Sequence, residues 1–166
     1  MSKKLNKSIL NKAVQLLAQR DHSSYKLNQK LTLFFARKIK SSDEEYHEQY
    51  HQLSSEINDV IEYCIEQNWM NDAQYIEKYI TMRANKGYGK YRIALELKQR
   101  GLPTDLSREI LNNSDINWSK IAHQQLIKKF KQIDPKNKPL WYKNIQFLTT
   151  RGYTQDDVKN VYSLLT

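Results

Sequence analysis

Cysteine, glycine and proline are scarce in this chain of 166 residues, which contains one Cys, four Gly and three Pro. A single cysteine cannot form an internal disulfide, so a disulfide-stabilised scaffold is excluded and a reducing, cytoplasmic setting is expected. So few glycines and prolines argue against a loop-rich all-β fold. No apolar run approaches the roughly 20 residues that cross a bilayer, and the basic start lacks a signal-peptide core. We therefore expect a cytoplasmic protein that does not use a membrane.

Positive charge is missing from one long stretch of the chain. No Lys or Arg occurs between Ser41 and Glu77, and this stretch holds ten of the eighteen acidic residues. The remainder carries all 27 Lys and Arg against eight acidic residues, and the formal net charge is +9. A chain polarised in this way can present one part to a polyanion and another to a basic or mixed protein surface. The alternative is that these charges only solvate helix faces.

Motifs of catalysis and of cofactor binding are also missing. The segment Gly87-Tyr88-Gly89 has no strand before it and no third glycine, so we interpret it as a turn between helices. His47 and His51 have a spacing that can bind a metal, but they lie in a polar, acidic connector, and a solvated helix is the preferred interpretation. Cys64 falls at helical spacing with Val60 and is interpreted as a small buried residue. We therefore predict a non-enzymatic protein with no catalytic residues, no cofactor and no metal.

Apolar residues recur at intervals of three and four along the whole chain, which predicts an all-α fold. The pattern divides into nine helices in three sets of three, with predicted domains at 1–68 (including the acidic connector), 69–113 and 114–166. Three short helices bury only a small core, so neighbouring sets must share apolar faces. The prediction is three tandem three-helix repeats in an elongated array. One central apolar residue from each helix, in order, is Ile9, Leu31, Ile57, Ile76, Ile93, Ile110, Ala122, Ile145 and Val161.

Two six-residue segments, 100–105 and 151–156, follow the same pattern: Arg, Gly, an apolar or aromatic residue, two further residues and Asp. Each follows an apolar stretch that ends in Leu, so each predicts a helix end with glycine in the left-handed region and then a new helix. Asn68 is predicted to play the part of glycine in a third, weaker copy. Thr154 with Asp157 predicts a capping box, and Pro103 is expected at the first helical position.

Basic and aromatic residues crowd the middle and third sets, and they are the candidate binding residues. Phosphate contacts need mobile cations, and aromatic rings between cations can stack bases. Arg92 and Lys98 are expected to face solvent, because the apolar face of their helix carries Ile93, Ala94 and Leu97. A helix-turn-helix that is only architectural is the alternative. The candidate partner- or DNA-binding residues are Arg83, Lys86, Tyr88, Lys90, Arg92, Lys98, Arg100, Lys128, Lys129 and Lys131.

Five segments in a fixed order cover nearly the whole chain: Ala18 to Ser23 with Lys26-Leu27 and Lys30-Leu31; Trp69 to Asp72 with Tyr75 and Tyr79; Lys86 to Gly89 with Arg92-Ile93 and Leu97; Arg100-Gly101-Leu102; and Arg151-Gly152-Tyr153. The ordered set resembles the RecX family of bacterial recombination regulators. Three positions depart from the family pattern, since Asn68 replaces Gly, Asn71 replaces Asp and Lys90 replaces Pro.

The resemblance implies three tandem three-helix repeats and a role without catalysis. It implies a monomer that binds the filament formed by the recombinase RecA on single-stranded DNA. Such binding would inhibit recombinase, ATPase and coprotease activity, and so regulate DNA repair, homologous recombination and the SOS response. A basic helical module that acts directly on DNA is the alternative, and the steep salt dependence of phosphate contacts would separate the two.

Overall fold

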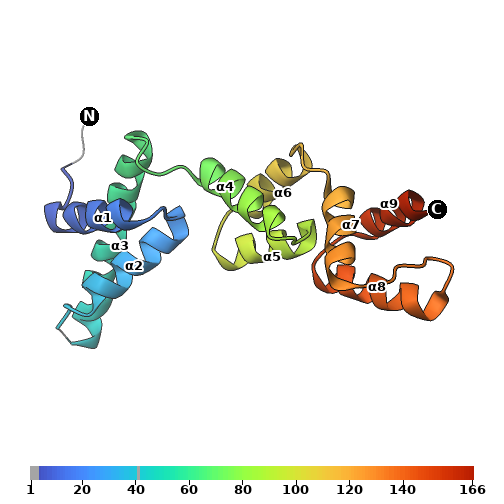
Figure 1. Cartoon of the computed structure of the whole chain (residues 1–166). Coiled ribbons are helices and arrows are strands. Elements are labelled where there is room, and N and C mark those ends of the chain that lie inside the picture. The colour runs from blue at the N-terminus through green and yellow to red at the C-terminus, as the bar shows by residue number, and fades with distance from the viewer. Residues whose placement is uncertain (1–3, 41) are drawn as a thin grey trace. The chain divides into compact units, whose positions relative to one another are not determined.

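The computed structural model describes residues 4–40 and 42–166, and every regular element in them is an α-helix. This confirms the predicted all-α fold class (Figure 1). None of the helices in the described part of the chain is both long and apolar enough to span a membrane. The helices are α1 (Lys7–Gln19), α2 (Ser24–Ala36), α3 (Asp43–Glu66), α4 (Asp72–Asn85), α5 (Lys90–Gln99), α6 (Thr104–Asn112), α7 (Trp118–Lys129), α8 (Lys138–Thr150) and α9 (Gln155–Leu165).

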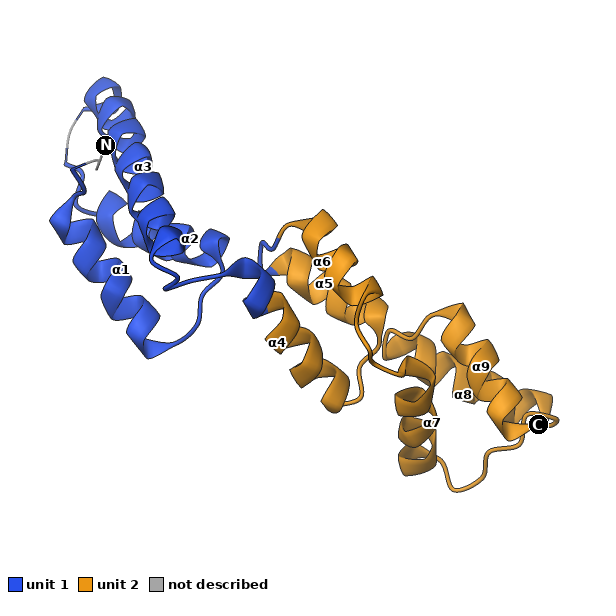
Figure 2. Cartoon of the chain, turned by 90° about the horizontal axis from the view of Figure 1, so that it is seen from above, with its two compact units in different colours: residues 1–75, 100–102 blue, residues 76–99, 103–166 orange. Residues whose placement is uncertain are grey.

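The described residues fall into two compact units (Figure 2). Unit 1 covers residues 4–40, 42–75 and 100–102, and unit 2 covers 76–99 and 103–166. The second and third predicted helix sets therefore lie largely within unit 2. The division into three domains at residues 68 and 113, and the elongated arrangement, stay predictions.

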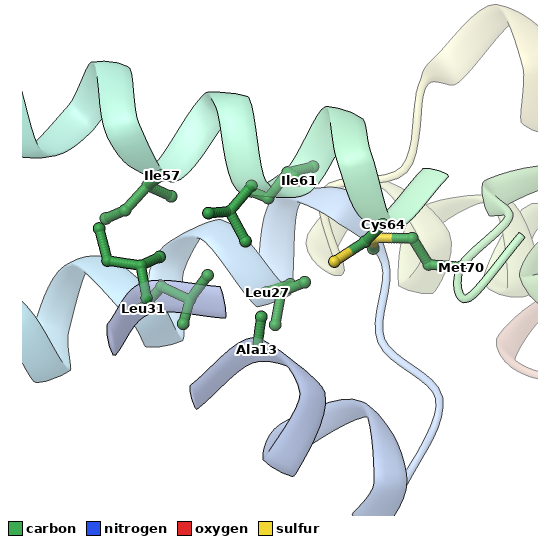
Figure 3. Packing of buried hydrophobic residues seen from close by; sticks show 9 residues of the cluster. Ala13, Leu27, Leu31, Ile57, Ile61, Cys64 and Met70 are labelled. Carbon is green, nitrogen blue, oxygen red and sulfur yellow. The ribbon is translucent and has the colours of Figure 1, made fainter. Parts of the chain in front are cut away.

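Unit 1 is a three-helix core built by α1, α2 and α3. Figure 3 shows Ile57 and Ile61 of α3 facing Leu31 and Leu27 of α2. Cys64 is fully buried in this cluster, as its spacing predicted. Burial raises the pKa of its thiol, so the group stays protonated and chemically inert. The first part of α3 extends away from this core, and residues 42–52, including His47 and His51, are exposed.

The predicted helix stops are confirmed by the backbone. Asn68, Gly101 and Gly152 have φ values of 60°, 79° and 95°, in the left-handed region. Thr154 and Asp157 form the predicted capping box at the start of α9. The expectation for Pro103 was wrong. Its extended ψ of 127° keeps it outside the helix, so it occupies the N-cap position and α6 begins at Thr104.

Unit 2 contains the cores of the second and third helix sets. Between α7, α8 and α9 the buried residues are Ala122, Leu126, Leu148, Tyr153 and Val161. In the second set, α4 and α5 bury Ile76, Ile80, Ile93 and Leu97. The turn between α4 and α5, residues 86–89, lies where these two sets meet, and it positions the candidate site.

Candidate interaction site

An arginine–tyrosine stack forms at the turn between α4 and α5. Gly87, with φ of 93°, reverses the chain, and the Tyr88 amide then donates to the carbonyl of Arg83 at 3.2 Å. Three guanidinium groups lie over the Tyr88 ring. Their central carbons are 4.0 Å (Arg83), 4.4 Å (Arg92) and 4.9 Å (Arg151) from the ring centroid. Attraction between a cation and the face of an aromatic ring stabilises this geometry.

One carboxylate, that of Glu96, organises two of the three arginines. Arg83 donates to both of its oxygens at 2.8 and 3.0 Å, and the Tyr79 hydroxyl donates to it at 3.1 Å. Arg92 approaches the same carboxylate at 3.7 Å. Burial alone would raise the pKa of Glu96, but the hydrogen bonds from Arg83 and Tyr79 outweigh it and the pKa is lowered. Glu96 is therefore ionised, and three guanidiniums against one carboxylate leave an excess of positive charge.

Arg151 reaches the stack because the segment 151–153 docks on the start of α5. The Gly89 amide donates to the Arg151 carbonyl, and the Tyr91 amide donates to the Gly152 carbonyl, both at 2.9 Å. The buried hydroxyl of Tyr153 donates to the Gly87 carbonyl at 2.7 Å, and burial raises its pKa. A Cβ on Gly89 would lie 2.5 Å from the Gly152 backbone, so this approach of two backbones requires glycine.

The structure distributes the ten predicted residues over several places. Arg83, Tyr88 and Arg92 meet in the stack. Arg92 is only partly open to solvent, with 41% of its side chain exposed, because it covers the Tyr88 ring. The expectation that it faces solvent freely was therefore wrong in part. Lys98 is exposed, as expected.

The other six predicted residues in unit 2 are lysines, and they lie at two further places. Lys90 and Lys98 line a groove between α5 and α6. Lys86 is exposed beside Gly87, whose Cα lies against the Gln125 side chain of α7. The exposed Lys128 and Lys129 follow on the last turn of α7, and the exposed Lys131 comes just after it.

Arg100, the tenth predicted residue, belongs to unit 1. Its guanidinium donates to the Tyr75 hydroxyl at 2.7 Å. The role of Arg100 in partner or DNA binding stays a prediction.

Two members of the site were missed by the sequence analysis. Arg151 was interpreted only as the residue before a helix stop, and Glu96 was not considered as a partner of the basic residues. The repeated Arg-Gly pair was the signal available for Arg151. Glu96 lies at i,i+4 from Arg92, a spacing at which opposite charges on a helix meet.

Comparison with known proteins shows what the chain is related to. The family model described as "RecX, second three-helix domain" matches residues 71–111, which include α4, the turn and α5. The chain is 34% identical to the regulatory protein RecX of Cronobacter sakazakii over 154 residues, which cover 93% of this chain and 90% of that protein. The chain belongs to the RecX family. The corresponding RecX protein of Yersinia enterocolitica is 33% identical over 164 residues, covering 93% of this chain and 96% of that protein.

Solved RecX structures share the fold. The crystal structure of RecX from Lactobacillus salivarius superposes with a TM-score of 0.71 at 20% identity, covering 96% of this chain and 95% of that one. A second crystal structure, of a regulatory protein RecX, gives a TM-score of 0.67 at 16% identity over 94% of this chain and 70% of that one. The predicted family resemblance is thus confirmed, and with it the role of a regulatory protein.

Proposed function

We propose that this RecX-family regulator binds the filament formed by the recombinase RecA on single-stranded DNA, and so inhibits or modulates its recombinase, ATPase and coprotease activities. The observation that carries the proposal is the arginine stack on Tyr88, because it combines excess positive charge with a fixed geometry. Glu96 occupies the guanidinium of Arg83, so the phosphate contacts fall to Arg92, whose side chain is 41% exposed, and to Arg151. The planar fork of a guanidinium matches phosphate oxygens in pairs.

The lysines near the stack extend this positive surface. Lys86, Lys128 and Lys129 are exposed, and α7 lies against the turn that carries Lys86. Mobile lysines contribute to phosphate binding without strict geometry, so they add affinity while the stacked arginines add orientation. This combination supports contact with the DNA backbone inside the filament.

Unit 1 supports contact with the protein part of the filament. The first turn of α3 carries Asp43, Glu44 and Glu45, and residues 42–52 are exposed throughout. An acidic surface can face a basic or mixed protein surface. Weak contacts made by both units would add up on one filament, as linked binding sites do. We expect a monomer to act in this way without a cofactor.

The test is inhibition of RecA ATPase on single-stranded DNA by a variant with Lys86→Glu, Lys128→Glu and Lys129→Glu. All three lysines are exposed, so the fold should persist, while inhibition should weaken about tenfold or more because several phosphate contacts are lost. The control is Lys159→Glu, an exposed lysine of α9. Full inhibition by the triple variant would mean that these three lysines contact only solvent and do not bind the filament.

Direct action on DNA is the second candidate function, because the same stack and lysines could bind bare single strands. The two functions differ in their response to salt, since phosphate contacts weaken steeply as the salt concentration rises. We expect the chain to bind RecA filaments at a salt concentration that abolishes its binding to bare DNA. Equal loss of both would favour direct action on DNA.

A further inference from the structure

A groove between α5 and α6 differs from the arginine stack in the side chains that line it. Its volume is about 420 Å³, within the roughly 300–1,000 Å³ range of ligand pockets. Aliphatic side chains line it, namely Ala94, Leu95 and Leu111, and Leu95 is 55% exposed. Three of its lining residues are cationic (Lys90, Lys98 and Arg108), and no acidic residue lines it. The groove is therefore apolar with positive charge around it.

Ser107 provides an independent sign that this groove takes a ligand. Its side chain lines the groove and is only 5% exposed. Its hydroxyl has no hydrogen-bond partner among the described residues. A buried hydroxyl without a partner destabilises the fold, so such groups are uncommon in native proteins. A polar group of a bound ligand would supply the missing hydrogen bond.

We propose that this groove binds an acidic segment of the recombinase that carries an aliphatic anchor side chain, an inference that rests on the proposed function. The anchor would occupy the space between Ala94, Leu95 and Leu111. Carboxylates beside the anchor would meet Lys98 and Arg108, both of which are exposed. A backbone or side-chain group of the segment would bond the Ser107 hydroxyl. This arrangement matches the common mode in which an amphipathic segment lays its apolar face into a groove.

A protein segment suits the groove better than a nucleic acid does. Bases of single strands stack on aromatic faces, but Tyr91 is the one aromatic residue among those that line the groove. The aliphatic lining instead favours an aliphatic side chain, whose burial is driven by the hydrophobic effect. The positive charge then selects an acidic segment and speeds its association.

The experiment measures binding of the full chain to two probes: RecA filaments on an oligo(dT) strand, and the bare oligo(dT) strand. Three single variants alter the groove, namely Ser107→Ala, Leu95→Gln and Lys98→Glu. Each should weaken filament binding about fivefold or more, and the two variants that leave the charge unchanged, Ser107→Ala and Leu95→Gln, should leave oligo(dT) binding within twofold. Leu164→Gln and Lys159→Glu on α9 are matched controls, since both residues are exposed and neither lines the groove.

Ser107→Ala distinguishes a loss of ligand binding from a loss of folding. Removing a buried hydroxyl without a partner should leave the melting temperature unchanged or raise it, so weaker filament binding cannot then come from unfolding. Unchanged filament binding by all three groove variants overturns the inference. An equal loss of oligo(dT) binding by Ser107→Ala or Leu95→Gln also overturns it, because the groove would then be a nucleic-acid site. Self-association of the parent chain that these variants abolish would assign the groove to a second copy and overturn the inference as well. Failure of the parent chain to bind filaments would instead refute the proposed function itself.

Discussion

The two copies of one short sequence pattern, residues 100–105 and 151–156, each form a joint, that is, a contact between a helix end and the start of another helix. The two joints differ. In unit 1 the Arg100 carbonyl accepts a hydrogen bond from the Ser23 hydroxyl at 3.2 Å, at the start of α2. In unit 2 the Arg151 carbonyl accepts from the Gly89 amide at 2.9 Å, just before α5. Both patterns contain a left-handed glycine and meet the start of a helix. The first joint relies on a side chain, whereas the second brings two backbones together.

The space around each glycine reflects this difference. A Cβ on Gly101 would lie 2.6 Å from the Cβ of Tyr25, which moves only with the start of α2, and against the Tyr25 ring, which is exposed and can turn. A Cβ on Gly152 would lie 2.6 Å from the backbone nitrogen of Arg92, which has no such freedom. The same residue pattern therefore forms a joint in unit 1 that is less strict than the joint in unit 2, where the backbone itself is contacted.

The largest expected effect comes from replacing these two glycines by alanine. Gly152→Ala should destabilise the protein by about 2–5 kcal/mol, because left-handed strain adds to an unavoidable clash with the backbone. Gly101→Ala should cost less, about 1–3 kcal/mol, since the strain remains while the Tyr25 ring can turn and the start of α2 can shift slightly. Denaturant unfolding of both variants measures the difference. Equal losses of stability in the two variants would contradict the predicted difference between the two joints.

A smaller effect is expected from Glu96→Ala, which tests how far the stack supports the joint of unit 2. The change leaves Arg83 and Tyr79 without their shared acceptor, and we expect a loss of about 1–3 kcal/mol. Filament inhibition should also weaken, because the arginines lose their fixed positions on Tyr88. Glu109→Ala on the exposed side of α6 is the control. A loss no larger than that of the control would show that Glu96 does not hold the stack.

The joint of unit 1 is expected to respond to pH through His22. Its Nδ1–H donates to the Arg20 carbonyl at 2.8 Å, and its Nε2 accepts from the Lys30 ammonium at 2.9 Å. Burial lowers the pKa of the ring from 6.5. The folded state then binds a proton less readily than the unfolded chain does. The stabilisation is complete above about pH 6.5 and is lost as the pH falls below it.

Melting curves of the parent and of His22→Gln between pH 5 and pH 8 test this expectation. The melting temperature of the parent should fall more steeply below pH 6.5 than that of the variant. Parallel curves for the two proteins would show that His22 is not the source of the pH dependence.

The smallest effect is expected at the third stop. Asn68 has φ of 60° and already tolerates the left-handed region, so Asn68→Gly should change the unfolding free energy by no more than about 0.5 kcal/mol, in the stabilising direction. Thermal unfolding beside Gly101→Ala gives the comparison. A marked loss of stability would show that the Asn68 side chain does more than tolerate the turn.

Local features were predictable because they depend on neighbours in the sequence. Helical periodicity, the stops at Asn68, Gly101 and Gly152, and the capping box of Thr154 with Asp157 all involve residues within a few positions of one another. Pro103 was the exception, since whether proline is the cap or the first helical residue depends on its ψ. The types of residue in the basic clusters were also evident from the sequence.

The sequence by itself determined the all-α class, the helix stops at Asn68, Gly101 and Gly152, and the membership of the RecX family. Only the tertiary structure decided which cations share a site. Tyr153 and Gly87 are 66 positions apart, yet their hydrogen bond and the contact of Gly89 with Gly152 bring Arg151 onto Tyr88. No local pattern reports such a contact, because it depends on two backbones that approach closely only when distant glycines meet. The same packing separates the lysines of the α5–α6 groove from the arginines of the stack, although they alternate along the chain.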